Sequence, residues 1–311
     1  MAEPVALVAL AVEAAVGWPA AVYARVGHPV GAFAAIIAAG EAAWNRPFWP
    51  FAARRAAGVL VMLGLIAIVG GGAFALQRAA ALTGAWGWLV CALLAAPGLA
   101  QRSLFDHVRA VQIALRNDDL DAARRAVAMI VGRDTHALDT AGVARAAIES
   151  LAESFCDGVA APLFWLLVAG LPGLWVYKAI NTADSLIGHR EPRWRAFGWA
   201  AAHTDDVLNL VPARLAGMLL CSVGARGWRI LWRDAGKHAS PNAGWTEAAM
   251  AGALGLSLAG PVAYDTVMAL KPWIGAGRRD ADARDIGRAL ALYVRACLAL
   301  WLIAGGIAWL L

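Results

Sequence analysis

Long apolar runs constrain this chain more than any other feature of its sequence. A helix needs about 20 apolar residues to cross a bilayer. The runs cover residues 4–23, 57–76, 85–100, 159–177, 207–224, 249–270 and 291–311. The chain is 61% hydrophobic and 16% charged, whereas soluble domains are about half apolar and a quarter charged. The sequence therefore predicts an all-α, polytopic membrane protein with roughly five to seven membrane-embedded helices, some of them re-entrant.

The domain organisation follows from the longest polar section. We expect residues 1–311 to form a single integral membrane domain, with residues 101–158 as a helical insertion outside the lipid. An apolar stripe at helical spacing predicts the first helix of this insertion: Leu104, Val108, Val111 and Leu115. Asp118 is placed to cap a second helix, and Asp139 or Thr140 to cap a third.

The distribution of charge and cysteine narrows the class of partner. The net charge of +5 is spread over nearly all polar stretches, which favours anionic headgroups or an anionic substrate. Nucleic-acid binding, which needs a clustered basic stripe, is not indicated. The four cysteines have no paired spacing, so neither a disulfide framework nor a zinc site is expected.

An acidic ladder in RAAIESLAESFCD is the first candidate site. Arg145, Glu149, Glu153 and Asp157 are spaced by four, so in a helix they share one face. Three stacked carboxylates repel one another, and a bound cation would compensate that repulsion. Gly158 would end this helix at the start of an apolar run. The alternative is a helix face that is merely solvated.

A second polar face is predicted in YKAINTADSLIGHR. Three- and four-residue steps place its members on one side of a helix: Lys178, Asn181, Asp184 and Ser185. A lysine, an amide and a carboxylate on one surface suit phosphate and a divalent metal. Anchoring at the membrane interface by Tyr177 and Lys178 would explain part of the same pattern.

Two further polar groups follow along the chain. The first contains Asp205, Asp206, Asn209 and Arg214, and its aspartates would alternatively cap the helix that begins there. The second is a loop punctuated by glycine and proline, with Arg233, Asp234, Lys237, His238, Ser240 and Asn242. This loop could present a lysine and backbone amides to an anion, although the chain has no Walker motif.

The sidedness of the loops is ambiguous because all of them carry lysine or arginine. If every apolar run crosses the bilayer, 101–158 and 178–206 lie on opposite sides. Pro162 and Pro172 suggest that 159–177 is broken or re-entrant, which would return both loops to one side. Two function classes remain at this point: a membrane enzyme for an anionic substrate with a divalent metal, and a transporter or channel. The dense chemistry near helix ends favours the enzyme.

Five ordered blocks of the sequence resemble a known family. They are VGRDTHALDTAGVARAAIESLAESFCDGVAAPLFW, LPGLWVYKAINTADSLIGHR, FGWAAAHTDDVLNLVPARL, RDAGKHASPNAGWTEAAMAGAL and an N-terminal pattern with Glu13, GWP at 17–19 and HPVG at 28–31. Together they resemble the CobD/CbiB family, the adenosylcobinamide-phosphate synthases of cobalamin biosynthesis. Three positions depart from the family pattern: Ser154 replaces a usual asparagine, Cys156 replaces a usual serine, and an arginine or lysine is more usual near His203.

The resemblance implies an inner-membrane, multi-pass enzyme whose active loops face the cytosol. It would join the propionate carboxylate of the corrinoid adenosylcobyric acid to (R)-1-amino-2-propanol or its O-phosphate, using ATP and Mg²⁺, beside other cobalamin-assembly enzymes. The alternative is a membrane corrinoid-binding or transport protein without synthetase activity.

The expected site residues follow from this resemblance. Glu149, Glu153 and Asp157 would hold Mg²⁺, and Glu149, Glu153 and Asp184 are the candidate catalytic carboxylates. Substrate or phosphate contacts are expected at Arg133, Asp134, Arg145, Lys178, Asn181, Ser185, Arg233, Lys237, His238 and Asn242.

Overall fold

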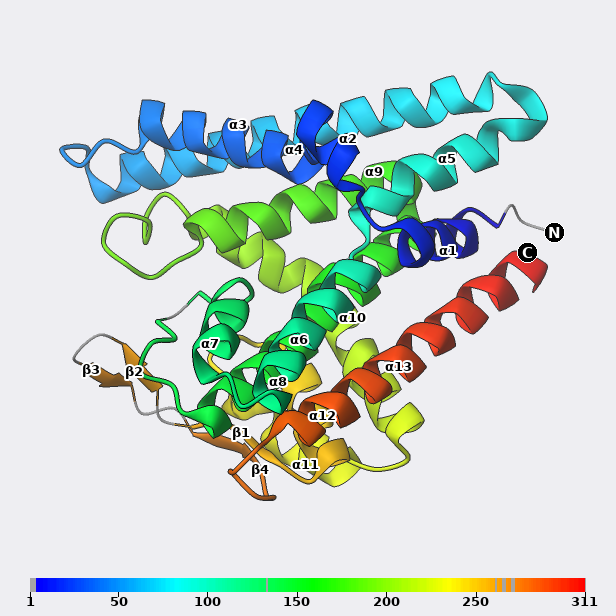
Figure 1. Cartoon of the computed structure of the whole chain (residues 1–311). Helices are drawn as coiled ribbons and strands as arrows, with labels where there is room; N and C mark the ends of the chain where they lie inside the picture. The colour runs from blue at the N-terminus through cyan, green and yellow to red at the C-terminus, as the bar shows by residue number, and fades with distance from the viewer. Residues whose placement is uncertain (1–3, 133, 261, 265–266, 270–271, 311) are drawn as a thin grey trace. The chain divides into compact units, whose positions relative to one another are not determined.

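Helices dominate the fold, which is that of an all-α polytopic membrane protein (Figure 1). The computed structural model describes residues 4–132, 134–260, 262–264, 267–269 and 272–310. Within these residues, six helical segments are long and apolar enough to cross a bilayer: Ala20–Trp44, Phe51–Ala81, Gly84–Arg116, Thr140–Ile187, Trp199–Gly224 and Ala283–Leu310. The range of five to seven embedded helices is therefore confirmed.

The chain divides into two compact units, each built from discontinuous stretches. The first unit contains Met1–Ala100, Ala161–Asn209 and Ala304–Leu311, and the second contains Gln101–Ala160 and Leu210–Ile303. The helix α10 (Trp199–Gly224) contributes to both, as does α13 (Ala283–Leu310).

The first unit is a bundle around two long helices. Its further elements are α1 (Val5–Val16), α2 (Ala20–Val26), α3 (Pro29–Trp44), α4 (Phe51–Ala81), η1 (Gly84–Trp86), α5 (Gly87–Ala95), η2 (Ala96–Gly98) and α9 (Ala161–Ile187). α4 packs along α9, and α3 packs on both (Figure 1). The apolar run 57–76 lies within α4, and α5 with η2 covers most of the run 85–100.

The predicted first span, 4–23, is wrong in its boundaries. α1 ends at Val16 because Gly17 adopts a positive φ of 62° and Pro19 follows in an extended conformation. His28 then caps α3, since its Nδ1 accepts from the Val30 N–H at 3.2 Å. The spanning segment at this end of the chain is Ala20–Trp44.

α9 is broken in its middle, as its proline content predicts. Ala169 and Gly170 have non-helical dihedrals, and Gly170 has a φ of 64°, which favours glycine. A Cβ on Gly173 would lie 2.4 Å from the Trp165 carbonyl oxygen, eight residues earlier. A straight helix would rise about 12 Å over eight residues, so the chain turns sharply at the break.

A side chain from α4 supports the break. The Leu171 N–H, which the break frees from the helix, donates to Gln77 Oε1 at 2.8 Å. Non-helical backbone at membrane depth is tolerated where protein satisfies its polar groups, and Gln77 supplies that partner. The re-entrant course of 159–177 remains a prediction.

The second unit surrounds α8 (Thr140–Phe155), which carries no exposed apolar side chain. The other elements are α6 (Gln101–Arg116), α7 (Leu120–Ala128), the π-helical turn η3 (Cys156–Ala160), α11 (Trp228–Asp234), η4 (Ala235–Lys237), α12 (Ala243–Leu254), β1 (Ser257–Ala259), β2 (Val262–Tyr264), β3 (Val267–Ala269) and β4 (Trp273–Gly275). α6, α7 and α12 all pack against α8 (Figure 1). The strands form two short antiparallel pairs, β1 with β4 and β2 with β3.

Three boundaries in this unit differ from the sequence prediction. Asp119, one residue after the predicted Asp118, caps α7, since its Oδ1 accepts from the Ala122 N–H at 2.8 Å. Gly158 does not end α8, because the chain continues through the π-helical turn into α9. The apolar run 249–270 is not a spanning helix: α12 ends at Leu254, and Gly255 follows in a left-handed conformation. The Asp139 cap is confirmed, with the Gly142 N–H at 2.6 Å.

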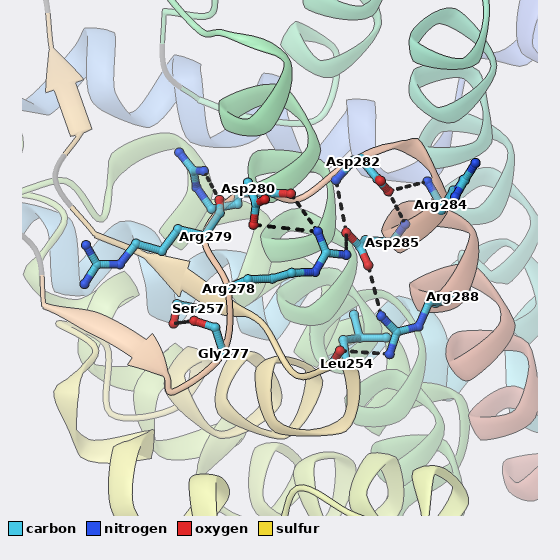
Figure 2. A network of polar contacts seen from close by, with 11 residues as sticks. Leu254, Ser257, Gly277, Arg278, Arg279, Asp280, Asp282, Arg284, Asp285 and Arg288 are labelled. Carbon is cyan, nitrogen blue, oxygen red and sulfur yellow. Dashed lines mark hydrogen bonds and ion pairs between the residues drawn. The ribbon is translucent and has the colours of Figure 1, made fainter.

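An ion-pair network fixes the start of α13 (Figure 2). Asp285, which is 1% exposed, accepts from Arg278 at 2.5 Å and from Arg288 at 3.0 Å. Arg288 also donates to the Leu254 carbonyl at 2.8 Å. The network thereby ties the loop after β4 to the ends of α12 and α13.

Candidate functional site

The acidic ladder lies on α8, as the spacing predicts, but its members have different surroundings. The Ala259 N–H donates to Glu149 Oε1 at 2.9 Å, so Glu149 reaches the end of β1. Ala259 itself has a φ of 56°, a strained conformation for a residue with a side chain. Glu149 therefore holds a strained backbone segment in place. Glu153 is exposed and Asp157 is half-buried.

The π-helical turn changes the register of the ladder at its C-terminal end. Asp157 lies inside Cys156–Ala160, where the widened helix no longer places it directly one turn after Glu153. π-bulges of this kind are frequent at functional sites, and the spacing of four could not reveal one.

Arg145 begins the ladder and belongs to an aromatic contact. Its guanidinium lies over the Trp273 ring, 5.6 Å from the centroid, and Arg279 lies over the same ring at 4.4 Å. Arg145 also donates to the Arg279 carbonyl. Two cations thus share one indole in this unit.

The loop after α11 is organised around a residue to which the sequence analysis gave no role. Asp234 is fully buried and accepts from Arg233 at 2.6 Å, from Lys237 at 2.6 Å and from the Gly275 N–H at 2.8 Å. The Arg233 guanidinium holds the pKa of the Asp234 carboxyl well below its usual range, and Lys237 and Gly275 act in the same direction. The two predicted phosphate-binding cations are therefore paired with a carboxylate. The sequence signal for this pairing is the segment RDAGK, in which an acidic residue lies between two cations.

The rest of this loop forms turns. His238 Nδ1 accepts from the Ser240 N–H at 3.0 Å, and its Nε2 lies 3.6 Å from Glu247 Oε1. Asn242 is buried and accepts from Arg214 Nη1 at 3.3 Å. Arg214 also lies over the Trp245 ring at 4.8 Å. Its charge within a predicted apolar run is thus stabilised by an amide and an indole.

The second polar face lies on α9 of the first unit and meets α10. Asn181 Nδ2 donates to Asp205 Oδ1 at 3.2 Å, and Asn209 Nδ2 donates to Asp205 Oδ2 at 3.0 Å. Tyr177 Oη donates to Asn209 Oδ1 at 3.0 Å. Lys178 is near enough to act electrostatically on Asp205. We call Tyr177, Lys178, Asn181, Asp205 and Asn209 the Asp205 cluster.

The remaining members of that face extend it toward the end of α9. Ser185 is exposed and donates to the Asn181 carbonyl at 2.9 Å. Asp184 is half-buried and lies against Gly188, where any Cβ would fall 1.9 Å from Asp184 Oδ1. Asp205 and Asp206 do not cap α10, because the helix begins at Trp199.

Two of the predicted residues remain, Arg133 and Asp134. Arg133 lies outside the described residues. Asp134 is exposed and accepts from the His136 N–H at 2.9 Å, which makes it a turn residue in this structure.

The acidic ladder is the predicted Mg²⁺ site of the chain. Among the residues that the structure describes, no three His, Cys, Asp or Glu side chains converge as a metal-binding group, and this includes Glu149, Glu153 and Asp157. Mg²⁺ is usually held by one or two carboxylates with water and substrate phosphates, not by an all-protein cage. The exposed Glu153 and half-buried Asp157 fit that mode, and the metal assignment remains a prediction.

Comparison with known proteins covers nearly the whole chain. A family model described as CobD/Cbib protein matches residues 6–293. A relative from Rhodobacter capsulatus is 49% identical over 306 residues, which is 97% of this chain and 96% of the relative. A relative from Sinorhizobium sp is 48% identical over 311 residues, 96% of each chain. One from Brucella suis is 46% identical over 295 residues, 92% of this chain and 90% of the relative. All three are named cobalamin biosynthesis protein CobD. No solved structure matches.

Proposed function

Because this chain belongs to the CobD/CbiB family, we propose that it synthesises an amide bond in cobalamin biosynthesis. The substrates are adenosylcobyric acid and (R)-1-amino-2-propanol or its O-phosphate, and the product is adenosylcobinamide or its phosphate. The observation that carries this proposal is the family match over residues 6–293. The matched range contains the acidic ladder of α8 and the Asp205 cluster.

The Asp205 cluster supports the binding of an anionic or hydrogen-bonding substrate. Asp205 is only 7% exposed and is held by neutral amides, while the half-buried Lys178 lies nearby. A lysine placed there can attract a phosphate or carboxylate. Asn181 and Ser185 on the same helix supply further polar groups for orientation.

Amide formation requires a neutral amine and an activated carboxylate. The incoming ammonium loses one proton before it attacks and a second as the amide forms, and Asp184 or Glu153 is assigned to accept a proton. ATP with Mg²⁺ supplies the activation, so that one carboxylate oxygen leaves with phosphate as the C–N bond forms. Glu149, Glu153 and Asp157 are assigned to Mg²⁺ through their hard oxygen atoms.

Further assignments concern the second unit. Arg145 and Arg133 are assigned to a corrin carboxylate or an aminopropanol phosphate, and Asp134 to the same region. The side chains of Arg233 and Lys237 are 43% and 39% exposed although paired, and each is assigned to an anion as well. His238 and Asn242 complete the polar loop. We further propose an inner-membrane location with cytosolic active loops, beside other cobalamin-assembly enzymes.

Product analysis tests this function. The full chain, purified in detergent, is incubated with adenosylcobyric acid, the amine or its phosphate, ATP and Mg²⁺, and the amide is identified by mass spectrometry. Loss of product without ATP is expected. A protein that binds the corrinoid but forms no amide under any of these conditions would instead be a corrinoid-binding or transport protein.

Three substitutions test the site assignment in the same assay. Glu149→Ala, Glu153→Ala and Lys178→Ala should each lower turnover, with Asp106→Ala as the matched control. Asp106 is an exposed carboxylate on α6 that pairs with Arg102 at 3.6 Å. Near-normal turnover in all three variants would refute the site assignment while leaving the function intact.

A further inference from the structure

A groove between α6 and α13 gathers arginines that the proposed reaction does not use. It has a volume of about 680 Å³, which lies within the range of small-molecule sites. One stripe of α6 lines it at helical spacing: Phe105, Arg109, Gln112 and Arg116. One stripe of α13 lines the other side: Arg284, Arg288, Ala291, Val294 and Arg295. All of these residues belong to the second unit.

The walls of the groove are held in place near Gly287. Gln112 Nε2 donates to the Ala283 carbonyl at 3.1 Å, which connects the two helices directly. A Cβ on Gly287 would lie 2.4 Å from Gln112 Nε2, so glycine permits this close approach. The shape of the groove therefore follows from the close packing of the two helices.

The charge in the groove is largely uncompensated. Of its five arginines, only Arg288 pairs with a carboxylate, that of Asp285. Among the described residues, the other four make no ion pair: Arg109, Arg116, Arg284 and Arg295. Figure 2 shows the Arg284 side chain extending away from the carboxylates of Asp282 and Asp285. Several guanidinium groups around one groove repel each other unless an anion joins them.

The apolar surface next to the groove indicates what kind of anion it takes. Val294, Leu298 and Leu302 are spaced by four along α13 and are 39%, 52% and 79% exposed. They lie in a helix long and apolar enough to span the bilayer. A ligand with a phosphate at the arginines and an acyl chain along this stripe would contact both the charged and the apolar surface. Inorganic phosphate would contact only the arginines.

We propose that this groove binds an anionic phospholipid, with the headgroup phosphate at the arginines of α6 and α13 and an acyl chain along Val294, Leu298 and Leu302. Arg109 and Arg284, from opposite walls, contact the phosphate. Guanidinium groups can form bidentate hydrogen bonds with the phosphate of either lipid class. The site should still prefer an anionic lipid, because in a zwitterionic lipid the headgroup cation offsets the phosphate charge that attracts the arginines. This site is independent of amide synthesis and needs no corrinoid.

Lipid binding to the purified full chain tests the proposal. Thermal unfolding is measured in detergent with added phosphatidylglycerol, phosphatidylcholine or inorganic phosphate. Of these three, phosphatidylglycerol alone should raise the unfolding midpoint and be retained in native mass spectra. Equal effects of the two lipids would overturn the proposal. So would stabilisation by inorganic phosphate without any effect of the lipid, which would identify a soluble-anion site.

Paired variants locate the effect. Arg109→Gln/Arg284→Gln should weaken phosphatidylglycerol binding about fivefold for each arginine removed, or about 25-fold together. The matched control is Arg125→Gln/Arg229→Gln, which removes two exposed arginines of the same unit that do not line this groove. If the double variant fails to fold, each single variant should still show its fivefold loss. Wild-type affinity in the groove variants would contradict the proposal.

Discussion

Two buried aspartates, one in each unit, have opposite surroundings. Asp234 is fully buried and receives hydrogen bonds from Arg233, Lys237 and a backbone N–H. Asp205 is 7% exposed and is held by the neutral amides of Asn181 and Asn209. Within the described residues, Asp205 makes no ion pair.

From this difference we expect Asp234 to be a structural carboxylate and Asp205 to act on the substrate. Asp234 is paired with two cations, and both of its oxygens accept hydrogen bonds. These contacts connect α11, η4 and β4. Asp205 is oriented by neutral amides, with Lys178 near enough to act on it electrostatically, and we expect its charge to serve a ligand or a proton. Buried polar groups of this second kind within membrane segments are costly, and they usually mark substrate or proton pathways.

The largest expected effect is on turnover. Asp205→Asn keeps the shape of the side chain and removes its charge, so we expect activity to fall by on the order of 100-fold, as for loss of substrate positioning. The unfolding midpoint should change little, because the hydrogen bonds to Asp205 come from the neutral amides of Asn181 and Asn209. Amide product formation and thermal unfolding of the same preparation check both parts. Unchanged turnover would show that Asp205, like Asp234, is structural.

Asp234→Asn should act mainly on stability. It leaves Arg233 and Lys237 without their partner. Breaking a buried ion pair lowers the free energy of unfolding by about 3 kcal/mol or more. We expect the lower end of this range because both cations are partly exposed. Denaturant or thermal unfolding measures this loss. Turnover per folded molecule should remain close to that of the wild type. A variant that is as stable as the wild type but inactive would show that Asp234 serves the reaction and not the fold.

Gln77→Leu tests the support of the broken helix. It leaves the Leu171 N–H without the acceptor at 2.8 Å, and an unsatisfied buried donor costs about 1–3 kcal/mol. The loss should appear as a lower unfolding midpoint. Gln77→Glu, which keeps an acceptor oxygen, is the comparison variant. Equal stability of Gln77→Leu and the wild type would show that Gln77 does not support the break.

The smallest effect is a pH dependence of stability. The pKa of Asp234 is lower in the folded chain than in the unfolded chain. Its contribution to the free energy of unfolding is therefore fully present above the pKa of the unfolded chain and is lost as the pH falls toward the pKa of the folded chain. The expected loss is about 0.3 kcal/mol at pH 4 and about 1.3 kcal/mol at pH 3. Asp234→Asn should lack this part of the decline. Parallel stability curves for the variant and the wild type would contradict the assignment.

Local patterns in the sequence predict some features of this fold well. The apolar runs predict the membrane class, the Asp139 cap predicts the start of α8, and the prolines of 159–177 predict the break in α9. Each depends on residues close together in the chain. The π-helical turn at Cys156–Ala160 and the strands after Leu254 depend on tertiary packing, which periodicity does not report.

The candidate site shows the same limit. Spacing of three and four correctly places Lys178, Asn181 and Ser185 on one helix. The link from Asn181 to Asp205 joins residues 24 positions apart on different helices, so only the structure reveals it. The pairing of Arg233 and Lys237 with Asp234 is likewise a matter of rotamers and burial.

The proposed amide synthesis is tested most directly by an isotope label. The purified wild-type chain is incubated with adenosylcobyric acid, ATP, Mg²⁺ and ¹⁵N-labelled aminopropanol or its phosphate, and the corrinoid products are analysed by mass spectrometry. We expect a corrinoid that carries the ¹⁵N atom in a new amide and whose formation requires ATP. Corrinoid that is bound by the protein and recovered without the label would contradict the proposed function.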